Sequence, residues 1–143
     1  PLLRLARSLE IDGRPALEND EVRQRIADFH VRLRGVEHSA NRTLTALSKG
    51  GIPGPEASLG KLVIAPLGQQ ISSFAVDLQG LAGAAIDGEF DFQRSFIGGP
   101  AMRLAGGTDE ILHNILAERV LRLPPEPRAD KGMAFQDIPK SRS

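Results

Sequence analysis

A hydrophobic pattern with helical period constrains the fold of this chain more than any other feature. Between Val22 and Leu47, apolar side chains recur every three or four residues, as they do on one face of an α-helix. Asn19 or Asp20 precedes the pattern as a helix N-cap, and a glycine- and proline-rich segment follows Lys49. The sequence therefore predicts a long amphipathic helix, of about seven turns, that buries one face against neighbouring helices.

Glycine and proline divide the chain on both sides of this helix. Residues 1–10 predict the end of a helix, and the Asp-Gly pair at 12–13 predicts a turn after it. Residues 50–55 (GGIPGP) predict a short connection, so a second long helix, residues 56–81, returns antiparallel to the first. Because an internal proline removes a backbone donor and crowds the preceding turn, we expect a kink in this helix at Pro66.

The last third of the chain alternates glycine-rich segments with shorter helical patterns. A glycine-rich loop at 80–88 precedes a short helix near 93–102, which we expect to be interrupted or bent at 98–100 (Gly-Gly-Pro). A final helix follows in residues 105–123. The tail, residues 124–143, contains proline and charged residues and predicts an extended or disordered segment.

The composition agrees with an all-α, up-down bundle of about four helices that occupies residues 1–123 as one domain. Hydrophobic residues make up 41% of the 143 residues and aromatic residues only 4%. The formal net charge is zero, so no overall field attracts nucleic acid, and no apolar run approaches the ~20 residues of a membrane span. The chain has no cysteine, which fits the cytoplasm. It opens at Pro1 inside a helical pattern, so we expect a fragment of a longer protein.

A glycine pair followed by an N-capping residue precedes the final helix. Gly106 and Gly107 allow positive φ, the Thr108 hydroxyl suits an N-cap, and Asp109 and Glu110 place negative charge at the positive end of the helix dipole. These residues allow two interpretations. The turn is either an ordinary helix start, or its N–H groups hold a phosphate or carbonyl oxygen.

The segment 105–127, AGGTDEILHNILAERVLRLPPEP, resembles the final long helix of the flavin-dependent acyl-CoA dehydrogenases. Weaker resemblance begins at about Gly13 and covers most of the chain. The resemblance implies the C-terminal helical domain of an enzyme that uses FAD to form an α,β-double bond in an acyl-CoA thioester. It also implies a homo- or hetero-oligomer, a dimer of dimers, that passes electrons to an electron-transfer flavoprotein.

The resemblance assigns cofactor and substrate contacts to the turn. In the family, the threonine and the acid two residues later contact FAD of the same subunit, and these residues are Thr108 and Glu110 here. Gly107 corresponds to a substrate-binding position. In the best-known branch the catalytic base is a glutamate at the position of Gly106, so the chain is expected to contribute no catalytic residue. We expect the base to lie upstream of Pro1.

A second family motif is a glycine-rich loop that reaches the adenosine end of FAD in a neighbouring subunit. The residues at the corresponding positions are Asp77, Gly80 and Leu81, where many relatives have glutamine, glycine and glycine. A plain helix C-terminus ended by glycine is the alternative interpretation of this segment.

A third family motif, which supplies an arginine for the pyrophosphate, is degraded in this chain. The aligned arginine position is Leu9, and the acids Asp12 and Asp20 are expected to repel phosphate. The degraded motifs suggest a heteromeric, actinobacterial subtype in which non-identical subunits share fewer FAD sites and act on steroid side-chain thioesters. The remaining alternatives are a base-lacking subunit of such an enzyme and a non-catalytic helical assembly module.

Other chemistries lack support in the sequence. His30, His38 and His113 do not have the spacing of metal ligands, so no metal site is expected. No nucleotide-binding P-loop and no serine-hydrolase motif is present. The arginines of the first long helix are expected to face solvent or another subunit, because no aromatic residues alternate with them as in a nucleic-acid surface.

Overall fold

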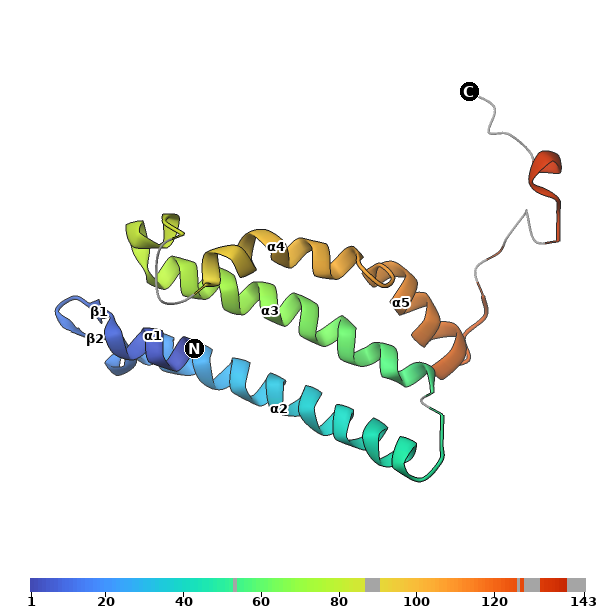
Figure 1. The fold of residues 1–143 in the computed structure, drawn as a ribbon, viewed down its shortest axis with the longest axis horizontal. Helices are drawn as coiled ribbons and strands as arrows, with labels where there is room; N and C mark the ends of the chain where they lie inside the picture. The colour runs from blue at the N-terminus through green and yellow to red at the C-terminus, as the bar shows by residue number, and fades with distance from the viewer. Residues whose placement is uncertain (53, 87–90, 126, 128–131, 139–143) are drawn as a thin grey trace.

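The computed structural model describes residues 1–52, 54–86, 91–125, 127 and 132–138. Within them the chain forms a bundle of helices (Figure 1), which confirms the predicted all-α fold. The helices and strands are α1 (Leu2–Ser8), β1 (Glu10–Ile11), β2 (Arg14–Pro15), α2 (Asp20–Ser48), α3 (Ser58–Leu78), α4 (Phe92–Leu104) and α5 (Asp109–Ile115). Helix α3 lies between α2 on one side and α4 with α5 on the other.

Helix α2 begins and ends close to the predicted positions. The side chain of Asn19 is the N-cap, and its Oδ1 accepts hydrogen bonds from the N–H groups of Glu21 at 3.0 Å and Val22 at 3.2 Å. The helix ends at Ser48, one residue before Lys49. The structure thus assigns the cap to Asn19 rather than to Asp20.

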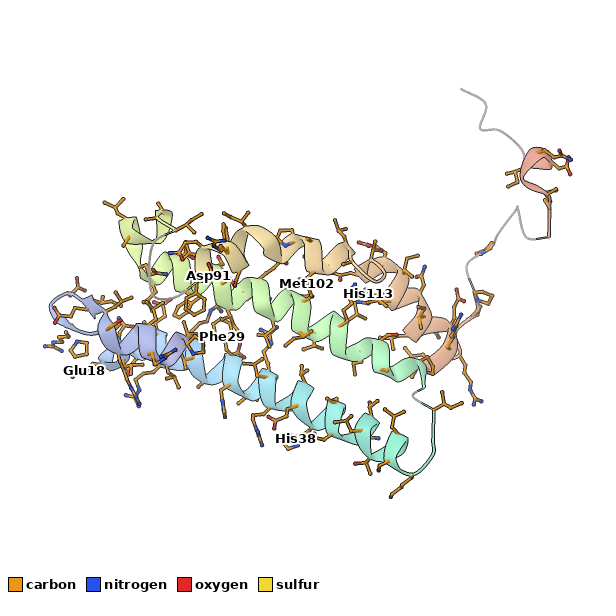
Figure 2. All side chains as sticks on the ribbon, viewed as in Figure 1. Glu18, Phe29, His38, Asp91, Met102 and His113 are labelled. Atoms are coloured by element: carbon orange, nitrogen blue, oxygen red, sulfur yellow. The ribbon has the colours of Figure 1, made fainter. Side chains whose placement is uncertain are left out.

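Aromatic and aliphatic side chains form the core between α2 and α3. Phe29 on α2 points toward α3 (Figure 2) and meets Phe74 edge-on, with ring centroids 5.8 Å apart. Leu67 on α3 is fully buried, and Val22 and Phe29 are the buried residues of α2. The N-terminal part of the predicted apolar face, at Val22 and Phe29, therefore packs into the core. Its C-terminal part does not, because Leu33, Leu44 and Leu47 are 38%, 61% and 45% exposed.

The predicted turn at 12–13 is the tip of a two-stranded antiparallel hairpin. Strand β1 pairs with β2 so that Glu10 lies opposite Pro15, and Asp12 and Gly13 have φ of 53° and 74°. Positive φ at both central residues is the geometry of a type I′ two-residue hairpin loop. The strands are too short to give a period-two pattern, so the sequence indicated only the turn.

Helix α3 is shorter than predicted because both of its ends tighten into 3₁₀ turns. Pro55–Ala57 precede it and Gly80–Ala84 follow it in this conformation. The helix runs without a break through Pro66. The predicted loop 80–88 therefore begins as a 3₁₀ turn, and its residues 87 and 88 lie outside the described residues.

The interruption expected in α4 at residues 98–100 does not occur, because α4 is continuous from Phe92 to Leu104. Packing explains the difference. A Cβ atom at Gly99 would lie 2.8 Å from Cγ of Gln69 on α3, so the glycine allows α4 to approach α3 closely. A contact with another helix thus outweighs the local preference of this tripeptide.

The final helix begins as predicted and ends in an unexpected form. Thr108 is the N-cap of α5, which is α-helical to Ile115 and continues as a π-helical turn over Leu116–Val120. Arg122, with φ of 57°, follows the end of this turn. A 3₁₀ turn at Phe135–Asp137 lies in the tail, outside the bundle in Figure 1. None of the helices described has the length and apolar character needed to cross a membrane.

Candidate functional site

The glycine turn between α4 and α5 is an open loop with left-handed backbone. Gly106 has φ of 66° and Gly107 has φ of 104°, which are conformations that favour glycine. No atom lies within 4 Å of a Cβ built on Gly106, so the space beside this residue is open. Gly106 is exposed, and Gly107 and Thr108 are half-buried.

Thr108 links the turn to the first residues of α5. Its Oγ1 accepts a hydrogen bond from the N–H group of Ile111 at 3.4 Å, which confirms the predicted N-cap. The pKa of the exposed Glu110 carboxyl is lowered below its ordinary value of 4.5. The larger cause is a hydrogen bond from the backbone N–H of Glu110, and the smaller one is a hydrogen bond from the Thr108 hydroxyl. Glu110 is therefore a carboxylate at neutral pH, held next to the cap.

Lys61, near the start of α3, is hydrogen-bonded to the backbone of the turn. Its Nζ donates hydrogen bonds to the carbonyl oxygens of Ala105 and Gly107. These carbonyls follow the C-terminus of α4, where a cation is favoured by the helix dipole. Nothing in the sequence pattern indicated Lys61, because it is more than 40 residues away from its partners.

Arg103 and Asp109 close the turn by a salt bridge across it. Nε and Nη2 of Arg103 lie 2.6 Å and 2.5 Å from Oδ2 of Asp109. Asp109 is buried at 7% exposure, and its Oδ1 has no hydrogen-bond partner among the described residues. Arg103, Lys61 and the Thr108 cap thus hold both ends of the turn and leave Gly106 open.

The second predicted site lies at the opposite end of α3. Asp77 is in the last turn of this helix, Gly80 follows it with φ of 56°, and Leu81 is 97% exposed. Lys61 and Asp77 are about 24 Å apart along the helix, at 1.5 Å per residue. The structure therefore does not bring Asp77, Gly80 and Leu81 together with Thr108 and Glu110 within one chain.

The hairpin, where the family's pyrophosphate arginine is missing, forms a shallow pocket that carries mixed charge. The lining residues are Ile11, Asp12, Arg14, Pro15, Glu18 and Asn19. Its acids are Asp12 and Glu18, and Asp20, the second acid of the prediction, is not in the lining. The repulsion of phosphate stays a prediction, and the Arg14 guanidinium in the same lining opposes it. The alignment on Leu9 did not identify this cation.

The histidines do not form a metal site. His30 and His38 are exposed on α2, and His38 lies on the side away from α3 (Figure 2). His113 on α5 is engaged by its own helix, because its Nδ1 lies 2.7 Å from the carbonyl oxygen of Asp109. In the described part of the chain, no three side chains of histidine, aspartate or glutamate gather where they could hold a metal ion.

Solved structures share this fold. A glutaryl-CoA dehydrogenase from Mycobacterium smegmatis, in complex with FADH2, superposes with a TM-score of 0.77 at 18% identity. The match covers 89% of this chain and 32% of the dehydrogenase chain. A chain of the ChsE4–ChsE5 complex from Mycobacterium tuberculosis superposes with a TM-score of 0.74 at 17% identity. The match covers 87% of this chain and 34% of the chain in the complex.

Sequence relatives agree with the structural match. The acyl-CoA dehydrogenase IpdE1 of Mycolicibacterium smegmatis is 33% identical over 113 residues, which is 78% of this chain and 28% of the relative. IpdE1 of Mycobacterium tuberculosis is 33% identical over 127 residues, or 85% of this chain and 32% of the relative. The chain thus spans about a third of the length of these relatives.

A family model described as "Acyl-CoA dehydrogenase, C-terminal domain" matches residues 2–121. The match includes all five α-helices described above, the turn at 105–108 and the segment after α3. The chain therefore belongs to the acyl-CoA dehydrogenase family and corresponds to its C-terminal domain.

Proposed function

We propose that residues 1–123 form the C-terminal helical domain of an FAD-dependent acyl-CoA dehydrogenase and that residues 124–143 are its tail. The observation that carries this proposal is the turn of Gly106, Gly107 and Thr108, which is held at both ends and open at its centre within the family match. Such a turn presents backbone N–H groups to a carbonyl or phosphate oxygen. We infer that it forms one wall of the FAD and acyl-CoA site.

The proposed reaction removes a proton from the α-carbon and a hydride from the β-carbon of the thioester, so that a double bond forms between them. FAD, when bound, supplies the hydride acceptor. A general base must accept the proton, and in the family pattern this base is a carboxylate. Gly106, at the family's base position, has no carboxylate, and the space beside it is open. We therefore propose that the base comes from a part of the enzyme outside these 143 residues or from a different subunit.

The residues of the turn fit the cofactor and the substrate in different ways. Thr108 and Glu110 are proposed to contact FAD of the same subunit, since the hydroxyl and the first turn of α5 lie beside the open glycine. Gly107 is proposed to contact the thioester, because its missing side chain lets a ligand approach the backbone. The Glu110 carboxylate suits the hydroxyl groups of FAD as an acceptor and disfavours direct contact with a phosphate.

Asp77, Gly80 and Leu81 are proposed to face the FAD of a neighbouring subunit. Asp77 lies about 24 Å along α3 from Lys61, the residue that holds the turn. At this distance, the two sites cannot contact the same part of one cofactor. An exposed leucine beside a left-handed glycine is available to a partner chain. This arrangement supports an oligomer in which the sites are completed between subunits.

Exposed apolar side chains on α4 and the start of α5 support the same assembly. The exposed large hydrophobic residues of these two helices are Phe96, Ile97, Met102, Leu104 and Ile111. By helical geometry, Phe96, Ile97 and Leu104 share one side of α4, and exposed apolar side chains that share a face mark protein interfaces. We propose a homo- or hetero-oligomer, a dimer of dimers, located in the cytoplasm, with an electron-transfer flavoprotein as the electron acceptor and with no role in nucleic-acid binding.

The mixed charge at the hairpin favours the heteromeric form. The pyrophosphate arginine is replaced by Leu9, and two acids line the pocket, so this surface is a poor partner for an FAD pyrophosphate. A base-lacking subunit that pairs with a different, complete subunit fits these changes. Steroid side-chain thioesters are the proposed substrates of such a complex.

The experiment is to express the complete coding sequence with and without its genomic neighbour and to count flavin per chain. We expect fewer flavins than chains in a mixed oligomer that oxidises an acyl-CoA thioester from a panel of straight-chain and steroid side-chain thioesters. Full flavin occupancy in a homotetramer would contradict the heteromeric proposal. A flavin-free assembly without dehydrogenase activity, alone and with the neighbour, would instead support a non-catalytic assembly module.

A further inference from the structure

Lys61 makes two contacts that together control the orientation of the glycine turn. Its ammonium group accepts no hydrogen bond and carries three donors, two of which are directed at the carbonyl oxygens of Ala105 and Gly107. The side chain is half-buried between α3 and the turn. One cation therefore fixes two peptide planes, Ala105–Gly106 and Gly107–Thr108, which lie on either side of the Gly106–Gly107 peptide.

The planarity of the peptide bond transmits this constraint to the opposite side of the turn. In a trans peptide, the C=O group and the following N–H group point in opposite directions. Because the carbonyls of Ala105 and Gly107 point to Lys61, the N–H groups of Gly106 and Thr108 point away from it. Neither N–H group has a backbone hydrogen-bond partner in the part of the chain that the structure describes.

The salt bridge of Arg103 with Asp109 closes the turn but does not set these two planes. It joins side chains that flank the turn and makes no contact with the carbonyl oxygens of Ala105 or Gly107. A positive charge beside a carbonyl oxygen also polarises the peptide, which strengthens its N–H group as a donor. Lys61 thus has both a geometric and an electrostatic effect on the two open donors.

We infer that Lys61 is a positioning residue for the dehydrogenation, which keeps the N–H groups of Gly106 and Thr108 directed at the bound thioester and cofactor. This inference rests on the proposed function of the turn. Lys61 touches neither ligand and acts through the backbone. Pre-organised donors stabilise the charge that develops on an oxygen in the transition state, so loss of Lys61 affects turnover more than binding.

The test compares variants in the assembled enzyme, expressed from the complete coding sequence with its partner subunit. Lys61→Met removes the donors and keeps the aliphatic stem, and Lys61→Arg restores a cation with several donors. Arg32→Met is the matched control, because the Nη1 of Arg32 donates to Oε1 of Gln70 on α3 at 2.7 Å and is not part of the turn. The readouts are kcat, KM, flavin per chain and Tm, with the thioester that the wild type oxidises fastest.

We expect Lys61→Met to lower kcat/KM about tenfold or more, mainly through kcat, with unchanged flavin content. Lys61→Arg should recover most of this loss, and Arg32→Met should stay close to the wild type. Unchanged kinetics of Lys61→Met, or an equal loss in Arg32→Met, would overturn the inference while the proposed function stands. A wild-type complex without flavin and without activity would overturn both.

Discussion

Among single residues, Glu110 is expected to give the stability of the protein a specific pH dependence. Its pKa is lowered in the folded state, so its ionised form stabilises the fold at pH values above 4.5, and this contribution is lost as the pH falls through the lowered pKa. Glu110→Gln should therefore lower Tm at neutral pH and have no such effect in strong acid. Thermal unfolding of both proteins across this pH range measures the difference.

The control for the change in net charge is Glu118→Gln, which removes the same charge outside the first turn of α5. A Tm difference for Glu110→Gln that stays constant from neutral to strongly acidic pH would show that the cap does not hold the carboxylate.

The salt bridge between Arg103 and Asp109 is expected to contribute to stability more than the surface pairs. Asp109→Ala leaves Arg103 without its partner and should cost about 1–2 kcal/mol, less than for a fully buried pair because the Arg103 side chain is 47% exposed. The matched control is Asp91→Ala, which breaks an exposed pair with Arg94 at 3.2 Å and should cost less than about 0.5 kcal/mol. Urea unfolding measures both changes, and equal losses would contradict the assignment.

Residue-level features could be predicted from the sequence where their causes are local. The Thr108 cap depends on residues within three positions, so the sequence identified it. Lys61 and Arg103 hold the same turn through contacts that depend on how α3, α4 and α5 pack, and no spacing in the sequence encodes that packing. The cofactor roles of Thr108 and Glu110 stay predictions.

At the scale of elements, two glycines should respond in opposite ways to the same substitution. A Cβ at Gly83 would lie 2.3 Å from the carbonyl oxygen of Val76 at the end of α3, so Gly83→Ala should destabilise the fold by about 1–3 kcal/mol. Gly98 lies inside α4 with no atom within 4 Å of a built Cβ. Gly98→Ala should therefore stabilise the fold by about 0.5–1 kcal/mol.

Chemical denaturation of the two alanine variants beside the wild type tests this pair. A stabilised Gly83→Ala variant would mean that the 3₁₀ turn after α3 is not packed against Val76. A destabilised Gly98→Ala variant would mean that α4 needs glycine at this position for a contact outside the chain.

The elements themselves were predictable where one periodicity dominates. Helix α2 followed from its apolar repeat and from Asn19, and its bounds differ little from the prediction. Of the interruption or bend expected at residues 98–100, the interruption does not occur, because the close approach of α4 to α3 compensates for two glycines and a proline. The bend stays a prediction. The π-helical turn at Leu116–Val120 has no sequence signature, so the last helix was expected to be uniform.

At the scale of the whole molecule, we expect the 143-residue chain alone to purify without flavin. The proposed FAD contacts of one chain lie at opposite ends of α3, so each cofactor would lack most of its contacts. The absorbance spectrum of the purified chain above the protein band tests this expectation. Stoichiometric yellow flavin in the isolated chain would show that these helices suffice to bind FAD.

The fold class was predictable from the whole sequence, whereas the complete site was not. Helical periodicity, short connections and the absence of long strand patterns indicated an all-α bundle, which the structure and the family match confirm. The candidate site is divided between the two ends of α3, and the base is not found at Gly106. A single chain cannot specify residues that another segment or subunit contributes.

The central place of α3 has a consequence for how the chain acquires its structure. Helix α3 packs against α2, which precedes it, and against α4 and α5, which follow it, so most contacts join elements that are neighbours along the chain. Local contacts of this kind give a low contact order, and such topologies fold rapidly because little loop-closure entropy is lost before contacts form. The bundle is therefore expected to fold rapidly, with α3 as the helix on which the others assemble.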